Sequence, residues 1–122
     1  MQKVVFDSSF LMTVVEKPTT WFEDIVEALG TVQPILLDCV KAELQKLALG
    51  GGGRSRTARV ALDLASRFAP ESCGGASVDD EIVSAARTSG AYVATMDSGL
   101  LTTLKAARIR AVTLSSGRIR LV

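Results

Sequence analysis

Short apolar runs rich in β-branched residues alternate along this chain with longer segments of helical periodicity. The first run, Val4-Val5-Phe6, ends at an aspartate, and similar runs follow at 34–38 and 91–95. Strands alternating with helices predict an α/β domain with a mainly parallel sheet, because parallel strands need long crossover connections. The last two runs, 109–114 and 118–122, flank a Ser-Ser-Gly turn and predict a terminal hairpin.

Capping residues and glycines mark the expected helices between these strands. The expected helices span about 10–16, 21–29, 39–49, 54–68, 77–89 and 100–107. Ser77 and Asp80 have the spacing of a capping box, and Gly90 ends that helix. Trp21 recurs with apolar residues at helical spacing, so we expect it in the core or at an interface rather than stacked on a ligand. Residues 70–76 form either a short strand or a loop.

Length and charge limit the class of protein. A chain of 122 residues suits one domain, 1–122, and a hydrophobic content of 48% suits a packed core. The 14 basic and 13 acidic side chains nearly cancel, which argues against a strongly basic nucleic-acid coat protein. The opening apolar stretch stops at Asp7, and no run reaches the ~18 apolar residues of a membrane span. We therefore expect a cytoplasmic protein with no membrane partner.

The chain has no histidine, which excludes a Ser-His-Asp triad, a Cys-His dyad and a His-ligated zinc within it. Its two cysteines, Cys39 and Cys73, lack CxxC spacing and cannot alone make a structural zinc site. We interpret them as buried thiols in a reducing cell interior, where disulfides are rare. A disulfide or a redox pair is the alternative interpretation.

Acidic residues occupy the positions where a parallel sheet builds its ligand site, beyond the carboxyl ends of the strands. Five such residues follow strands or begin the helices after them: Asp7, Glu43, Asp79, Asp80 and Asp97. Taken singly, each aspartate also suits a helix cap or the helix dipole, and Glu43 suits a solvated helix face. The short apolar strand before Asp7 is typical of a central strand, which favours a shared site.

Carboxylates gathered in one place need a cation. Two like charges about 4 Å apart repel by about 4 kcal/mol at an effective dielectric of about 20. Ligation by oxygen alone suits the hard ions Mg²⁺ or Mn²⁺. Such a site performs phosphoryl chemistry without histidine, because the metal lowers the pKa of a bound water, aligns it and stabilises the leaving oxygen.

Three stretches, in this order and at this spacing, resemble the motifs of the PIN-domain nucleases between Val4 and about Val112. They read VVFDSSFLM, VKAELQKL and VDDEIVSAARTSGAYVATMDSGL. The resemblance implies a three-layer α/β/α fold and a Mg²⁺- or Mn²⁺-dependent endoribonuclease that cleaves single-stranded RNA. The sequence looks closest to the archaeal and eukaryotic rRNA-processing branch, with the VapC toxins as relatives.

The resemblance also implies the site residues. The acidic set is Asp7, Glu43, Asp79 or Asp80, and Asp97, with Ser9 and Thr95 supporting it through hydrogen bonds. The spacing back from Gly90 favours Asp79 as the ligand, whereas the helical pattern also permits Asp80. Ser98-Gly99 follows Asp97 where many relatives have a second acid or Asn, so a complete second metal site is not implied.

Clustered basic residues suggest where a substrate would bind. Arg54, Arg56 and Arg59 follow four consecutive glycines, and a flexible loop with arginines could grip a phosphate backbone. The alternative is a solvated helix start. In the same expected helix, Val60, Leu64 and Phe68 form an apolar face. A second basic group near the C-terminus comprises Lys105, Arg108, Arg110, Arg118 and Arg120, of which the last two suit protection of an edge strand.

Three other functions fit parts of the pattern. A receiver-like signalling domain has the same fold class, but it should carry an acid pair after the first strand and a lysine after the last parallel one, and this chain has neither. A non-catalytic PIN-fold RNA-binding module and a VapC-type toxin nuclease are the alternatives within the family. The partners expected besides RNA are a second copy in a homodimer, a ribosome-assembly partner, or an antitoxin for the toxin alternative.

Overall fold

The computed structural model describes residues 1–122 and contains one six-stranded sheet in the order β3-β2-β1-β4-β5-β6. The strands are β1 (Gln2–Phe6), β2 (Val32–Leu37), β3 (Ala69–Glu71), β4 (Tyr92–Ala94), β5 (Ala111–Ser115) and β6 (Arg118–Leu121). The first five pair in parallel, and β6 pairs antiparallel to β5 as the expected hairpin. The prediction of a mainly parallel sheet is confirmed.

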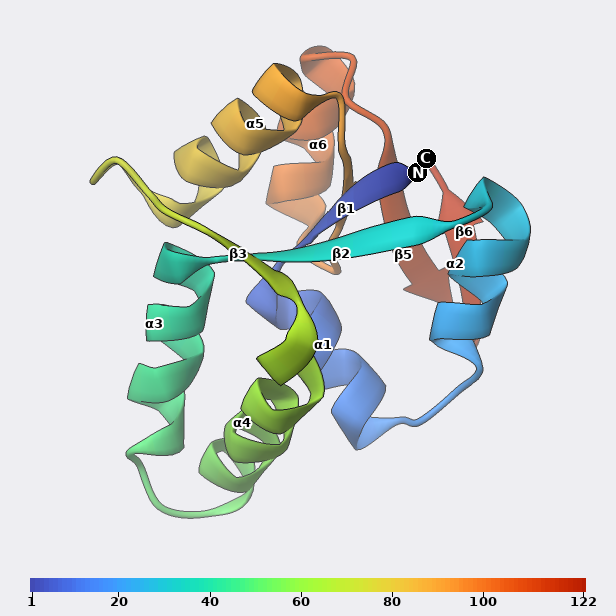
Figure 1. Ribbon diagram of the computed structural model, residues 1–122. Coiled ribbons are helices and arrows are strands. Elements are labelled where there is room, and N and C mark those ends of the chain that lie inside the picture. Colours follow the sequence, from blue (N-terminus) through green and yellow to red (C-terminus); the bar gives the residue numbers. More distant parts are fainter.

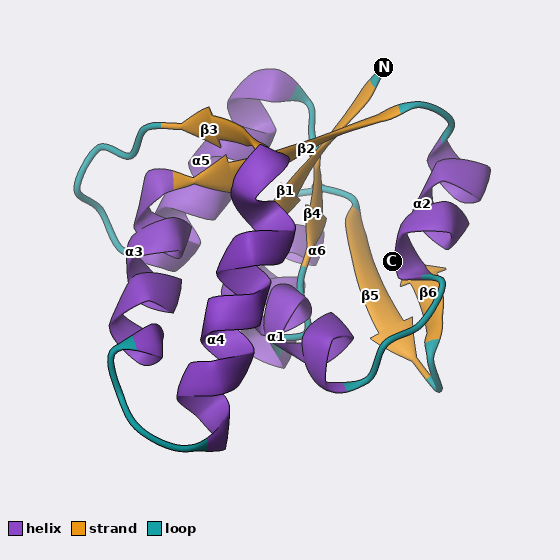
Figure 2. Ribbon diagram, turned by 60° about the horizontal axis from the view of Figure 1, so that its bottom comes forward, coloured by secondary structure: helices purple, strands orange, loops and turns teal.

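Helices cover both faces of this sheet (Figures 1 and 2). They are α1 (Ser8–Glu16), α2 (Trp21–Leu29), α3 (Asp38–Ala48), α4 (Gly53–Leu64), α5 (Val78–Ser89) and α6 (Ser98–Ala106), with a short 3₁₀ turn at Ala65–Arg67. Because parallel crossovers are right-handed, connections running outward from β1 to β3 put α1, α3 and α4 on one face. The connections from β3 back to β4 and on to β5 put α5 and α6 on the other. None of the helices is long and apolar enough to cross a membrane.

The strand order reverses between β1 and β4: the chain adds β2 and β3 on one side of β1 and then β4 and β5 on its other side, with all five strands parallel. Phe6 lies beside Ala94, so both strands end at the same level. The Asp7 backbone N–H donates to the Ala94 carbonyl oxygen at 2.9 Å, which extends the pairing one residue further. Ligands of open α/β sheets bind at such a reversal, beyond the carboxyl ends of the strands.

An aromatic cluster anchors β1 against the helices on one face. The Phe6 ring lies 5.6 Å from Phe10 and 5.7 Å from Trp21 between centroids, both edge to face. Trp21 is buried, which confirms that it belongs to the core. This packing holds the end of β1 and the start of α1 in a fixed relation, and Asp7 lies between them.

The buried face of α4 differs from the one predicted. Val60 is 48% exposed and Leu64 39% exposed, whereas Ala58, Ala61 and Ala65 are buried. The helix packs against both α3 and α1. Small side chains let three helix backbones approach closely, so the larger apolar residues are left toward the surface.

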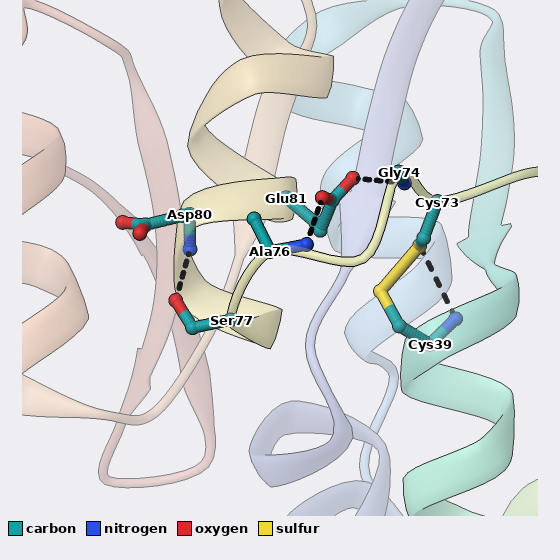
Figure 3. Close-up of a disulfide and its surroundings, with 7 residues drawn as sticks. All are labelled: Cys39, Cys73, Gly74, Ala76, Ser77, Asp80 and Glu81. Carbon is teal, nitrogen blue, oxygen red and sulfur yellow. Dashed lines mark hydrogen bonds between the residues drawn. A yellow bond between two sulfur atoms is a disulfide. The ribbon is translucent and has the colours of Figure 1, made fainter.

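The expectation of two free thiols is wrong, because Cys39 and Cys73 form a disulfide (Figure 3). Cys39 is the second residue of α3, and Cys73 follows β3 by two residues. Since β3 lies parallel beside β2, the end of β3 comes close to the start of α3. Their Cα atoms are 6.0 Å apart, within the usual range for a bridge. Spacing along the sequence could not reveal this proximity.

Candidate active site

Asp7 sits at the N-cap of α1 with only 5% of its surface exposed. Its Oδ2 atom accepts two short hydrogen bonds, from Ser9 Oγ at 2.6 Å and from Thr95 Oγ1 at 2.7 Å. Such charge-assisted bonds to a carboxylate are stronger than neutral ones. They compensate for burying the charge and fix the direction in which the carboxylate points.

The same two hydroxyls also accept hydrogen bonds from the backbone that follows β4. Ser9 Oγ accepts the Met96 N–H at 2.9 Å, and Thr95 Oγ1 accepts the Asp97 N–H at 3.0 Å. Each hydroxyl therefore donates to the carboxylate and accepts from the chain, which ties the ends of β1 and β4 together. Both hydrogen bonds end on Oδ2 of Asp7. The other carboxylate oxygen, Oδ1, accepts no hydrogen bond.

A pocket of about 680 Å³ opens beside Asp7. Its lining comprises Asp7, Ser8, Ser9, Glu43, Lys46, Leu47, Gly50, Arg54, Asp79 and Asp97. The four acids are widely separated in the sequence: Asp7 and Asp97 follow β1 and β4, Glu43 lies in the second turn of α3, and Asp79 lies in the first turn of α5. The sheet reversal is what brings them around one pocket.

The surroundings of Asp79 make its ionisation costlier. The pKa of Asp79 lies above its ordinary value, first because of partial burial and then because of the negative charges of Asp7, Asp97, Glu43 and Asp80. As the side chains stand, no three acids are close enough together to hold one ion directly among them. They surround the pocket rather than converge on a point.

Asp79 and Asp80 have different surroundings although they are adjacent. Asp79 lines the pocket and Asp80 does not. The Asp80 N–H donates to Ser77 Oγ at 3.2 Å, and its carboxylate points away from the loop that precedes α5 (Figure 3). The expected cap at Ser77 is therefore present.

Glu81 makes the contact from α5 back to the preceding loop, as Figure 3 shows. Its two carboxylate oxygens accept the N–H groups of Gly74 and Ala76, each at 2.9 Å. These bonds favour the ionised form and lower the pKa of Glu81. They hold the segment between Cys73 and α5, and thereby the start of the helix that carries Asp79.

Two polar side chains of the pocket, Ser8 and Lys46, were not identified as site residues from the sequence. Ser8 Oγ donates to Glu43 Oε1 at 2.6 Å, which links α1 to α3 across the pocket. Lys46 follows Glu43 by three residues and therefore shares its helix face, a spacing that could have pointed to it. Nothing in the sequence around Ser8 distinguishes it from a helix cap.

Of the three arginines predicted to bind substrate, only Arg54 lines the pocket, next to the glycine loop. Arg56 is exposed and lies outside the lining. Arg59 donates from Nη1 to the carbonyl oxygen of Ala48 at 3.0 Å, where it satisfies a free carbonyl at the end of α3.

Fold and pocket together define an α/β domain with an acidic site at the reversal of a parallel sheet. A family model described as "PIN like domain" matches residues 4–117. The chain therefore belongs to the PIN-like domain family and is a nuclease domain of the PIN type, as the sequence motifs indicated.

Solved structures agree with this assignment. The structure of the PIN domain endonuclease Utp24 is 29% identical with a TM-score of 0.81, over 98% of this chain and 90% of that one. A domain of a functionally unknown protein from Methanocaldococcus jannaschii shares the fold at 19% identity and a TM-score of 0.67, over 95% of this chain and 93% of that one. PAE2754 from Pyrobaculum aerophilum also shares the fold, at 18% identity and a TM-score of 0.55, over 83% of this chain and 78% of that one. No curated protein sequence matches the chain significantly.

Proposed function

We propose that this domain is a Mg²⁺- or Mn²⁺-dependent endoribonuclease that cuts single-stranded RNA in the pocket beside Asp7. The observation that carries the proposal is the gathering of Asp7, Glu43, Asp79 and Asp97 around one pocket at the sheet reversal. The likeness to the PIN domain endonuclease Utp24 supports internal cleavage. A role in rRNA processing stays a prediction.

The residues present fit a hard divalent cation. The acids of the pocket offer only oxygen ligands, and the pKa of Asp79 is raised first by burial and then by repulsion from the neighbouring acids, which a cation would relieve. Mg²⁺ usually keeps several waters and binds only one or two carboxylates directly, so acids spread around a pocket suit it. Asp7, Glu43, Asp79 and Asp97 would hold the ion, which would supply an activated water and charge stabilisation at the phosphate.

The protein's own groups prepare this site. Ser9 and Thr95 hold Oδ2 of Asp7, so Oδ1 is the atom turned to the ligand. Ser8 fixes one oxygen of Glu43 in the same manner. Side chains held in this way need little reorganisation when charge develops in the transition state.

Lys46 and Arg54 give the pocket its positive charge. An RNA strand is a polyanion, and four carboxylates alone would repel it. The guanidinium group can bind a phosphate through two parallel hydrogen bonds, and the ammonium group acts as a point charge. We assign both side chains to the phosphates next to the cleaved bond. Arg56 would contact RNA only outside the pocket.

The test is cleavage of a fluorescent single-stranded RNA by the pure protein in Mn²⁺, in Mg²⁺ and in EDTA. Asp7→Asn should fold, because the amide oxygen can still accept both hydroxyl hydrogen bonds, yet it should lose at least about 100-fold in rate. Asp79→Asn should lose activity similarly, whereas its neighbour Asp80→Asn is the matched control and should keep it.

Cleavage that survives in EDTA or in Asp7→Asn would contradict the proposal. RNA binding without cleavage in either metal would identify a non-catalytic RNA-binding module instead. Equal losses in Asp79→Asn and Asp80→Asn would show that general charge, rather than the pocket, controls the rate.

A further inference from the structure

A second pocket, of about 340 Å³, lies at the opposite end of the sheet from the acidic one. It is enclosed by the C-terminal ends of α5 and α6 and by the starts of β4 and β5. Arg87, Arg108 and Arg110 line it, and no acidic residue does. Three exposed arginines thus line one concave site without an acidic residue among its lining.

The arginines are not engaged elsewhere in ion pairs. The single salt bridge of the structure joins Arg118 to Asp24. Arg110 is held in place by Tyr92, since its Nη1 donates to the tyrosine hydroxyl at 2.8 Å and its guanidinium carbon lies 5.8 Å from the ring centroid. Arg108 has a φ of 58°, which is uncommon for a residue with a side chain.

The helix ends offer a simpler explanation, because cations near a helix C-terminus stabilise its dipole. The C-terminal ends of α5 and α6 each correspond to about half a negative charge, or about one together. Three arginines carry three positive charges. The helix ends therefore leave a clear positive excess at this pocket.

We propose that this arginine pocket binds a backbone phosphate of the RNA strand that is cut in the acidic pocket. Arginine suits this ligand because its planar fork matches phosphate oxygens. The inference rests on the proposed nuclease function and adds a second contact to it, away from the cleaved bond.

Helix α5 connects the two pockets. Asp79 in its first turn lines the acidic pocket, and Arg87 near its end lines the arginine pocket. Eight residues of helix span about 12 Å. A stacked strand advances about 3.4 Å per nucleotide, so a strand following α5 reaches the arginine pocket about four nucleotides from the acidic one. A contact there also offsets the repulsion of RNA by the acids.

The test measures RNA binding by fluorescence anisotropy in Mn²⁺, with all proteins carrying Asp7→Asn to prevent cleavage. The probes are a labelled oligouridylate of ten nucleotides and one of three. Arg87→Gln with Arg108→Asn removes two charges, and asparagine tolerates the positive φ at position 108. Arg67→Gln with Arg120→Gln is the control, because it removes the same charge from exposed positions outside the pocket.

The pocket variant should bind the decamer several-fold more weakly, with the slope of log K against log salt smaller by about 0.7 for each lost phosphate contact. Its affinity for the trinucleotide, and its cleavage of the trinucleotide with Asp7 restored, should not change. The control should bind both probes as the parent does.

Equal weakening in pocket variant and control would show a bulk charge effect and overturn the inference, as would an unchanged decamer affinity. If the intact protein cuts RNA but the pocket variant binds normally, only this inference fails. If the pocket variant loses decamer affinity but the intact protein never cuts, only the nuclease proposal fails. Absence of decamer binding by the parent would overturn both.

Discussion

Thr95 supports the acidic site from a fully buried position, without lining the pocket itself. Its hydroxyl donates to Asp7 Oδ2 and accepts the Asp97 N–H. One side chain therefore serves two of the proposed metal ligands. The Thr95 hydroxyl also lies 3.2 Å from Ser9 Oγ, so the two hydroxyls that bind Asp7 are in contact with each other. This makes Thr95 a positioning residue whose effect can be separated from that of charge.

Replacing Thr95 with valine should weaken both folding and cleavage. Valine keeps the shape, but it removes a buried donor from Asp7 and leaves the part-buried Asp97 N–H without a partner, at a cost of about 1–3 kcal/mol in unfolding free energy. Urea denaturation measures the first effect, and the RNA cleavage rate the second. Thr95→Ser keeps the hydroxyl and should retain the cleavage rate. A valine variant as active as the parent would show that the hydrogen bond does not position Asp7.

For single residues, the sequence predicted which acids lie near the pocket more readily than how each side chain points. Asp7 and Asp97 follow apolar strands, and that placement is visible in the residue pattern. The choice between Asp79 and Asp80 is not, because consecutive helix residues point about 100° apart and the phase depends on where α5 starts. Ser77, whose hydroxyl receives the Asp80 N–H, marks that start in the structure.

Among the elements, the start of α5 is held by an arrangement that the capping pattern only partly describes. Ser77 caps the helix as expected, but Glu81 rather than Asp80 reaches back, and it binds two loop N–H groups instead of one. Gly75, between the two bonded residues, has a φ of 93°, so a side chain there would strain the loop. The carboxylate thus shapes a tight loop as well as a helix end.

The Glu81 contact predicts a dependence of stability on pH. Its pKa is lowered in the folded protein by the N–H groups of Gly74 and Ala76, so its contribution is complete above the ordinary value of 4.5 and is lost as the pH falls through the lower folded-state value. Glu81→Gln should remove this part of the acid dependence and should speed amide hydrogen exchange at both loop residues at neutral pH. Unchanged exchange in the variant would contradict the assignment.

Helix α4 shows why the pattern of large apolar residues failed for one element. Periodicity assigned the buried face to Val60 and Leu64, whereas alanines occupy it. Hydrophobic periodicity weights side chains by size, but a helix enclosed between two others needs small ones at the contact. Trp21 in α2 follows the ordinary rule, since only one face of its helix is covered, and there the prediction was correct.

For the whole molecule, the sequence predicted the alternation of strands and helices but not the order of the strands. The order β3-β2-β1-β4-β5-β6 follows once the crossovers turn back across β1, and that reversal creates the acidic pocket. The parallel pairing of β2 with β3 puts the start of α3 beside the loop before α5. The disulfide between Cys39 and Cys73 joins α3, which carries Glu43, to the loop that leads into α5, which carries Asp79.

Reducing this disulfide should lower the stability of the fold and weaken metal binding in the acidic pocket. It closes a loop of 34 residues, and releasing that constraint on the unfolded chain should lower the unfolding free energy by roughly 3–4 kcal/mol. Urea denaturation with and without dithiothreitol measures the difference. Cys39→Ser with Cys73→Ser should match the reduced parent and should not respond to the reductant.

Reduction of the disulfide should affect cleavage less than stability, and only through metal affinity. Glu81 still holds the loop and Ser8 still holds Glu43 after reduction. A titration of the cleavage rate against Mn²⁺ separates an effect on metal affinity from an effect on the maximal rate. A shift to higher Mn²⁺ at an unchanged maximal rate is the expected result, since the acids remain present but less restrained. Reduction that leaves the unfolding free energy unchanged would contradict the predicted stabilisation by the bridge, and a lower maximal rate would place the bridge among the groups that position the reacting phosphate.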